Sequence, residues 1–171
     1  MTHLTRVREA QVINAGQIFV EGLGFLGVTT EIEIPAVEFE TYEQNAGFYK
    51  SNLNTGIIKP LVLKVKLAEY NSVLCESMSK QFDESSNIYA KWNVSSPKGH
   101  FSHIATFRGN ITKNTLPKIK FGESVELELE VQCYFMKLEV KGITEFLIDT
   151  RNLICQINGK DIWQGIRNNV M

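Results

Sequence analysis

The sequence contains few cysteines and no long apolar run. Its three cysteines, Cys75, Cys133 and Cys155, are widely spaced and form no CxxC pair. We therefore expect small, buried hydrophobic side chains in a reducing compartment and no disulfide framework. No run approaches the ~20 apolar residues that a membrane helix needs, and residues 1–9 lack the basic and apolar blocks of a targeting peptide. The chain is expected to have no membrane segment.

An excess of charge of either sign is also missing. The 18 basic and 19 acidic residues give a formal net charge of -1, which leaves no electrostatic footprint for gripping nucleic acid or an anionic membrane. Hydrophobic residues make up 43% of the chain and charged residues 22%, as in ordinary globular proteins. Residues 1–171 are expected to form a single domain with a core of its own.

The common catalytic motifs are absent. No GxSxG, P-loop or HExxH motif occurs. His100 and His103 form an HxxH pair, but a strand would direct the two imidazoles to opposite faces, and no CxxC pair lies nearby. We expect a protein that is not an enzyme, with no catalytic residue, metal or cofactor. A small enzyme or ligand-binding β-barrel stays an alternative, which would require polar side chains converging in the mouth of a barrel.

One glycine-rich stretch imitates a dinucleotide-binding motif. Residues 22–27, GLGFLG, match GxGxxG after a predicted strand at residues 17–21. That motif needs a helix to begin at its third glycine, because the pyrophosphate lies on the helix N-terminus. Residues 28–34 are instead β-branched and alternating, and Pro35 ends the run. We therefore interpret the glycines as the loop of a β-hairpin.

The strongest pattern in the chain predicts one very long strand over residues 123–141. Apolar and polar residues alternate from Val125 onward, as in a strand with one buried face. The apolar positions change parity near Phe135 and Met136, which requires a bulge or bend. Nineteen residues at about 3.3 Å each would span roughly 60 Å. Part of this strand is therefore expected to project beyond the domain and to pair with a partner.

The remaining patterns indicate a mostly β protein. A short central helix is expected at residues 73–80, with Asn71 and Ser72 as its cap, and a short C-terminal helix at 161–169, with Asp161 as its cap. We expect about eight strands, mostly antiparallel, in an antiparallel β-barrel or two-sheet sandwich. Besides the long strand, the expected strands cover residues 17–21, 28–34, 37–41, 61–67, 88–94, 104–111, 145–148 and 153–157, with an irregular edge at 116–121.

Residues 42–56 form the first candidate functional segment. They are rich in Asn and Gly, carry aromatic residues and show no amphipathic repeat. A loop of this length inside a compact domain is uncommon and is often functional. We interpret it as an extended contact loop for another subunit, with Phe48, Tyr49 and Lys50 at its tip. The alternative is that both aromatic side chains fold back onto their own domain.

Glu126, Glu128 and Glu130 form the second candidate site. They share one face of the long predicted strand at intervals of about 6.6 Å, and three like charges require a solvated face. This face is either an ordinary solvent face or the lining of a channel. A channel in which DNA slides should avoid a continuous basic track, and an acidic strand is compatible with that requirement. Lys64 and Lys66 on another predicted strand could offset the acidic charge.

The C-terminal residues also resemble a known family. The stretch KLEVKGITEFLIDTRNLICQINGKDIWQGIRNNV is similar to the C-terminal signature of the major tail tube proteins of contractile-tailed phages and phage-tail-like bacteriocins. Lys141 and residues 146–147 depart from that signature without changing its spacing. The opening segment and the FRG stretch at 107–109 match the family as well. The matching residues are Phe19, Val20, Gly22, Gly27, Ile34, Pro35, Lys137, Leu138, Val140, Gly142, Ile148, Asp149, Asn152, Asn158, Gly159, Asp161 and Arg167.

The resemblance implies a structural role. It implies homohexameric rings stacked into the inner tube of a contractile tail, with residues 42–56 reaching toward the neighbouring ring. The implied partners are a sheath protein outside, a baseplate and tail terminator at the ends, and tape-measure protein and DNA in the lumen without sequence-specific binding. The implied location is the virion, after synthesis in the host bacterial cytoplasm. A tube of a tail-like bacteriocin or of a secretion or injection machine stays an alternative.

Overall fold

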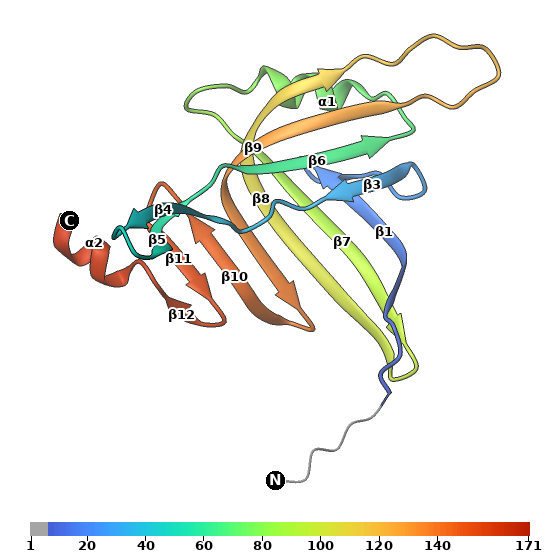
Figure 1. Ribbon diagram of the computed structural model, residues 1–171. Helices are drawn as coiled ribbons and strands as arrows, with labels where there is room; N and C mark the ends of the chain where they lie inside the picture. Colours follow the sequence, from blue (N-terminus) through green and yellow to red (C-terminus); the bar gives the residue numbers. More distant parts are fainter. Residues whose placement is uncertain (1–6) are drawn as a thin grey trace.

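Two long antiparallel strands, β8 (Gly99–Thr115) and β9 (Leu127–Val140), form the centre of the fold. The computed structural model describes residues 7–171 of the chain (Figure 1). On the side of β8 away from β9, the sheet continues through β7 (Ser86–Ser96) to β1 (Val12–Val20), and all of these neighbours are antiparallel. The alternating burial along the first half of β7 is typical of a strand with one face on the core and the other toward solvent.

The other side of β9 is shared by two strands, so the sheet branches there. The first half of β9 pairs with β6 (Leu61–Leu67), which in turn pairs with β3 (Thr29–Glu33). The second half pairs with β10 (Ile143–Asp149). Two short strands, β11 (Ile154–Ile157) and β12 (Lys160–Asp161), extend this branch.

A bulge at Tyr134 separates the two halves of β9. Arg108 lies opposite Phe135 while the next residue of β8, Gly109, lies opposite Cys133, so Tyr134 has no counterpart. The buried positions of β9 change from odd to even residue numbers at this point, because Leu127, Leu129 and Val131 are buried before it and Met136 after it. The face exchange predicted near Phe135 and Met136 is therefore confirmed.

The predicted beginning of this strand is wrong. β9 begins at Leu127, residues 123–126 are not in a strand, and Val125 is exposed. The reason lies in the neighbours: Leu67, the last residue of β6, is opposite Leu127, and Thr115, the last residue of β8, is opposite Glu128. Alternation continues upstream in the sequence, but no strand remains there to supply hydrogen bonds.

The sheet curls so that the end of β1 approaches the start of β3, although no strand pairing joins these two strands among the described residues. Phe25 N–H donates to the Ile18 carbonyl at 2.9 Å, and Ile18 N–H donates to the Thr29 hydroxyl at 3.3 Å. Residues 28–34 contribute β3 and not a helix, and β2 (Leu23–Gly24) pairs with the end of β1, so the glycines form hairpin turns as predicted. The curled sheet encloses the core, whose largest buried side chains include Ile18, Phe25, Leu63, Leu67, Leu74, Ile88, Phe107, Ile111, Leu127, Leu129, Met136 and Ile148.

One helix, α1 (Ser72–Ser79), covers one end of this core. The Asn71 side chain accepts a hydrogen bond from Val73 N–H at 3.0 Å, so the predicted cap is confirmed, and Leu74 is fully buried. A mostly antiparallel β fold with two short helices is thus confirmed.

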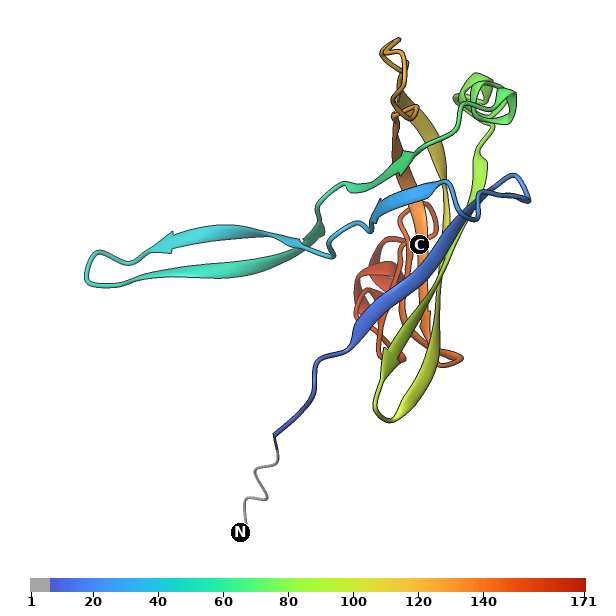
Figure 2. The same ribbon diagram turned by 90° about the vertical axis from the view of Figure 1, so that its right-hand side faces the viewer.

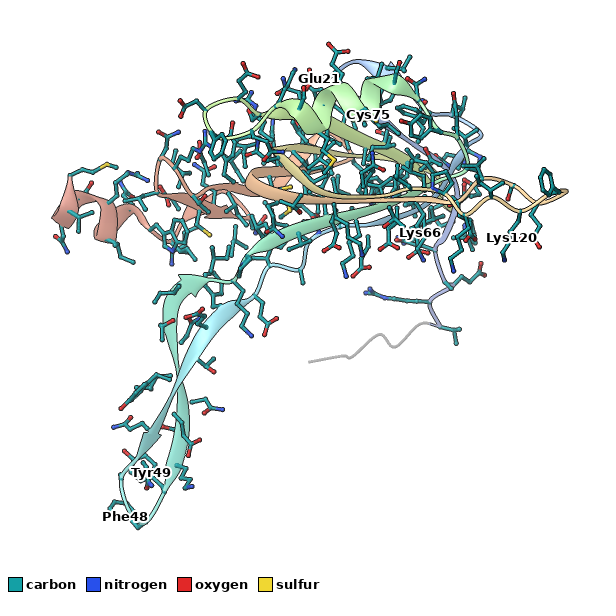
Figure 3. The ribbon with its side chains drawn as sticks, turned by 90° about the horizontal axis from the view of Figure 1, so that it is seen from above. Glu21, Phe48, Tyr49, Lys66, Cys75 and Lys120 are labelled. Carbon is teal, nitrogen blue, oxygen red and sulfur yellow. The ribbon has the colours of Figure 1, made fainter. Side chains whose placement is uncertain are left out.

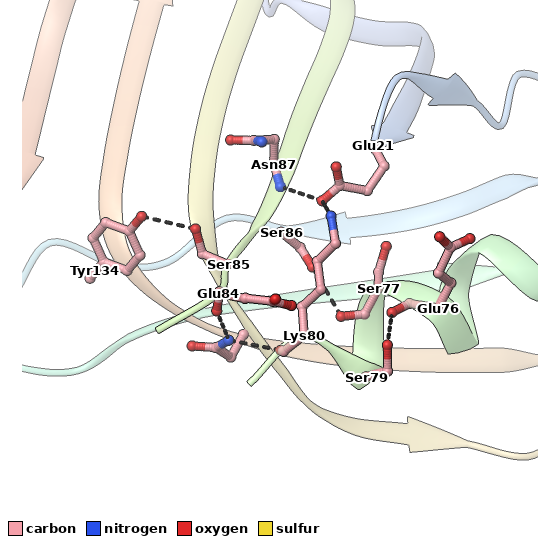
Figure 4. A network of polar contacts seen from close by, with 11 residues as sticks. Glu21, Glu76, Ser77, Ser79, Lys80, Glu84, Ser85, Ser86, Asn87 and Tyr134 are labelled. Atoms are coloured by element: carbon pink, nitrogen blue, oxygen red, sulfur yellow. Dashed lines mark hydrogen bonds and ion pairs between the residues drawn. The ribbon is translucent and has the colours of Figure 1, made fainter. Parts of the chain in front are cut away.

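A polar network fixes α1 against the sheet (Figure 4). The carboxylate of Glu21 accepts a hydrogen bond from Asn87 N–H at 2.9 Å and pairs with the Lys80 ammonium at 3.2 Å. The buried Ser86 hydroxyl donates to the Ser77 carbonyl at 3.1 Å. These contacts join the β1–β2 turn, the end of α1 and the start of β7, so the helix cannot move independently of the strands.

The three cysteines are free, but they differ in exposure. Cys155 is buried, and Cys133 is partly buried, with burial raising the pKa of its thiol to about 12. Cys75 on α1 is exposed, with its Sγ 2.9 Å from the Tyr70 hydroxyl oxygen, so the prediction that all three are buried is wrong for Cys75. Its position on the outer face of a short helix was not recognisable from an isolated cysteine.

The C-terminal helix begins later than predicted. α2 (Gln164–Val170) has Trp163 at its N-cap with no side-chain cap, so Asp161 does not cap the helix in the predicted way. Asp161 lies in β12, where its carboxylate accepts hydrogen bonds from the Trp163 and Cys155 N–H groups at 3.1 and 3.4 Å and pairs with Arg167 at 2.9 Å. The carboxylate thus joins β11, β12 and α2 into one C-terminal clamp.

The clamp should open in acid. Partial burial opposes ionisation of Asp161, but the hydrogen bonds from Arg167, Trp163 and Cys155 outweigh it and lower the pKa of this carboxyl. The folded pKa is below the unfolded one, so the stabilisation is present above the unfolded pKa and is lost as pH falls through the folded pKa, below about pH 4. In a Trp92→Phe background, we expect the emission of the buried Trp163 to shift to the red over this range. Asp161→Asn should remove the dependence of the Trp163 emission on pH in this range. An unchanged dependence would show that another group controls the clamp.

Candidate functional site

A β-hairpin projects away from the sheet (Figure 2). It consists of β4 (Phe39–Asn45) and β5 (Lys50–Ile58), which pair only with each other among the described residues 7–171. The absence of regular structure predicted for residues 42–56 is therefore wrong. Both faces of the hairpin are exposed, so burial imposes no alternation on its sequence, and the pattern that reveals the other strands is missing.

The predicted contact residues lie at the tip of the hairpin (Figure 3). Phe48 is 91% exposed and Tyr49 47%, and their rings touch edge to face with centroids 5.1 Å apart. The ammonium of Lys50 lies 3.4 Å from the Glu43 carboxylate across the hairpin. Gly47 supplies the turn with a φ of +86°, which its lack of a side chain permits. The two rings pack on each other and lie far from the sheet.

The base of the hairpin is held firmly. The indole N–H of Trp163 donates to the Gly56 carbonyl at 2.9 Å, and Trp163 is buried. Lys59 and Glu38 are joined by a backbone hydrogen bond of 2.8 Å and a side-chain contact of 2.6 Å. The aromatic tip is thus presented on a fixed arm, which reduces the entropy lost when it binds a partner.

The predicted acidic stripe is part of a mixed-charge surface on the solvent face of the sheet. Glu128 and Glu130 lie in β9, whereas Glu126 precedes the strand and is exposed. Lys66 and Lys64 of β6 lie directly opposite Glu128 and Glu130, so the offset by these lysines that the sequence left open is present. Two rows of facing residues result: Glu31, Lys66, Glu128 and Thr115 in one, and Glu33, Lys64, Glu130 and Lys113 in the other.

Each row contains one specific ion pair. Lys66 contacts Glu31 at 3.1 Å and Lys113 contacts Glu130 at 3.5 Å. The hydrogen bond and negative charge of Glu31 raise the pKa of Lys66. Glu31, Glu33 and Lys113 were not among the predicted site residues, although the alternation in residues 28–34 already placed both glutamates on one face. The sequence pattern does not contain the register that brings acidic and basic strands side by side.

The structure offers no cluster suited to metal chemistry in its described part. Across residues 7–171, no three His, Cys, Asp or Glu side chains gather closely enough to hold a metal ion. His100 Nδ1 lies 2.7 Å from the Ser95 hydroxyl, whereas His103 packs beside Trp92 with ring centroids 5.4 Å apart. The HxxH pair is thus divided between two separate environments. None of the helices in this region is long and apolar enough to cross a membrane.

The curled sheet with open edges and the projecting aromatic hairpin define a structural subunit that assembles with other chains. The family model for phage tail tube protein FII matches residues 10–170. The chain belongs to this family and is a subunit of a contractile tail tube, as the resemblance of its C-terminal residues implied. The family is a structural one.

Solved structures share the fold. A chain of the sheath–tube complex of an extracellular contractile injection system, PVC, in its extended state, has 10% sequence identity and a TM-score of 0.56, over 73% of this chain and 88% of that one. A chain of the sheath/tube terminator structure of the same system has 10% identity and a TM-score of 0.58, over 78% of this chain and 99% of that one. No curated protein matches the sequence.

Proposed function

We propose that residues 1–171 form one tube domain, and that homohexameric rings of this chain stack into the inner tube of a contractile phage tail. The open edges of the sheet support ring formation. β1 pairs with β7 on one side and, within the described residues, only through Phe19 and Val20 with β2 on the other. Unpaired edges invite association, and ring closure removes them.

The β4–β5 hairpin supports the proposal that the rings stack. Phe48, Tyr49 and Lys50 reach the adjacent ring, because the arm projects away from the sheet whose edges form the ring (Figure 2). Along the arm, Tyr42, Leu53 and Ile57 are also exposed. Exposed apolar side chains in such number on a thin hairpin are typical of a surface that is covered in an assembly.

Glu126, Glu128 and Glu130 line the lumen in this proposal. Lys66 and Lys64 interrupt the acidic charge opposite Glu128 and Glu130, and the glutamates of β3 and β9 on either side of these lysines interrupt the basic charge in turn. Such a surface offers no continuous basic track on which DNA would be held through released counterions. DNA and the tape-measure protein therefore pass without sequence-specific binding during envelope penetration.

The proposed surroundings follow from the tube. A sheath protein covers the outside, as in the sheath–tube complex that shares the fold, and a baseplate and a tail terminator close the ends. The chain is made in the cytoplasm of a host bacterium and becomes part of the virion. The likeness to an extracellular injection system supports a second candidate, a tube that carries protein and no DNA. Nuclease-protected DNA in purified particles would decide for the phage tail.

Negative-stain electron microscopy over a concentration series tests the assembly. We expect rings with a central hole at low concentration and open-ended tubes at high concentration, because association at sheet edges and hairpins depends on concentration. Strictly monomeric particles over the whole series would contradict the proposal.

A further inference from the structure

An apolar groove opens between the edges of β1 and β3. It has a volume of about 550 Å³, and among the described residues Glu31 is its one charged lining residue. The carboxylate of Glu31 is already paired with Lys66. The apolar lining consists of Ile13, Ala15, Leu26, Ile32, Ile34 and Trp92.

This groove is incompletely covered in the single chain. Ile13 is 67% exposed and Leu26 71%. Both flanking strands expose backbone groups toward it, because β1 pairs there with β7 only and β3 with β6 only among the described residues. Apolar side chains between two free strand edges indicate a site that another element fills on assembly.

The C-terminal helix presents an exposed apolar stripe. Ile162, Ile166 and Val170 are spaced four residues apart, which places them on one side of α2 and of the turn before it. All three are exposed. The stripe carries no charge.

The stripe is held in a fixed position. Arg167 donates to the Leu153 carbonyl at 2.9 Å and pairs with Asp161, while the buried Trp163 anchors the start of the helix. A partner that binds this stripe therefore does not have to order the helix first.

The stripe and the groove lie at opposite ends of the sheet. In Figure 1, α2 lies at the far left, and β1 and β3 lie to the right. Figure 2, seen from the right-hand side, places β1 in front and the C-terminal helix behind. A cyclic ring with head-to-tail contacts needs two different surfaces on opposite sides of one subunit. This placement satisfies that condition.

We propose that α2 of one copy inserts Ile162, Ile166 and Val170 into the β1–β3 groove of the next copy in the same ring. This inference rests on the proposed ring assembly and assigns one lateral contact in addition to the strand edges. The other exposed apolar segments fit less well. The loop at 116–126, with Ile119 and Phe121, lies at the same end of the molecule as the groove, and the β4–β5 hairpin projects away from the sheet (Figures 1 and 2).

Cysteine crosslinking in assembled tubes tests the contact directly. The variant combines Ile166→Cys with Ile13→Cys in a Cys75→Ser background, which removes the exposed native thiol. The two new thiols lie at opposite ends of the folded subunit, so a disulfide between them can form only between neighbouring copies. We expect oxidation to give a ladder of covalent oligomers ending at the closed ring, and no ladder with either cysteine alone. A ladder from Phe121→Cys or Phe48→Cys with Ile13→Cys, and none from Ile166→Cys, would overturn the proposal.

A charge variant gives a second readout. Ile166→Asp should leave the thermal unfolding of the subunit unchanged and raise the concentration needed for rings at least about tenfold, because a carboxylate would enter an apolar groove. Asn168→Asp adds the same charge on the opposite side of α2, where no groove contact is expected, and should assemble normally. Unchanged assembly of Ile166→Asp would overturn the helix contact but leave the tube intact. Wild-type protein that forms no ring would instead overturn the proposed function itself.

Discussion

The double variant Phe48→Ser, Tyr49→Ser is expected to fold and to form rings, but not to stack into tubes. The aromatic side chains of Phe48 and Tyr49 are exposed at the tip of the hairpin and contribute nothing to the core. Buried aromatic anchors at an interface contribute about 2 kcal/mol or more each, and every copy in a ring would lose both. Sedimentation should show rings in place of long tubes, and circular dichroism should match that of the wild type.

Phe82→Ser is the matched control for this variant. Phe82 is 91% exposed, the same fraction as Phe48, but it lies in the loop after α1 and not on the hairpin. We expect its loss to leave stacking unchanged. Tubes of normal length and yield from the double hairpin variant would show that the tip does not bind the next ring.

Gly109→Ala is expected to destabilise the fold severely. A Cβ at this position would lie 2.1 Å from the Gln132 carbonyl oxygen and 2.8 Å from Cys133 Cα, both atoms of the neighbouring strand β9. Backbone atoms cannot move aside by rotation of a side chain, so β8 and β9 would have to separate next to the Tyr134 bulge. The destabilisation should reach about 4 kcal/mol or more. Urea denaturation followed by circular dichroism measures it.

Gly165→Ala provides the comparison. A Cβ at Gly165 in α2 would meet no atom within 4 Å, so alanine should be neutral or stabilise the helix by up to about 1 kcal/mol. If Gly109→Ala retained the wild-type urea midpoint, the close approach of β8 and β9 would not be needed for stability. Equal losses from both variants would also contradict the steric explanation, since only one site is crowded.

The sequence alone was sufficient wherever one side of an element is buried. Residues 61–67 alternate strictly, and β6 has those bounds. The parity change near Phe135 predicted the bulge at Tyr134, because a strand with one apolar face cannot change parity without an extra residue. The helix cap at Asn71 was equally predictable from the sequence, since it depends on one side chain and its adjacent backbone. The spacing of the C-terminal residues was enough to indicate the tail tube family.

Tertiary structure decided everything that depends on which strands are neighbours. Beyond the predicted strand at 37–41, the hairpin has two solvated faces, so no hydrophobic period marks the rest of β4 and β5. Glu126 alternates correctly but lies outside β9, because β6 and β8 end before it. The pairing of Glu128 and Glu130 with lysines, and the groove opposite α2, arise from strand register and from the curl of the sheet. A linear pattern records which side of a strand is apolar, whereas the hydrogen-bonded neighbours of that strand are set only when distant segments pack together.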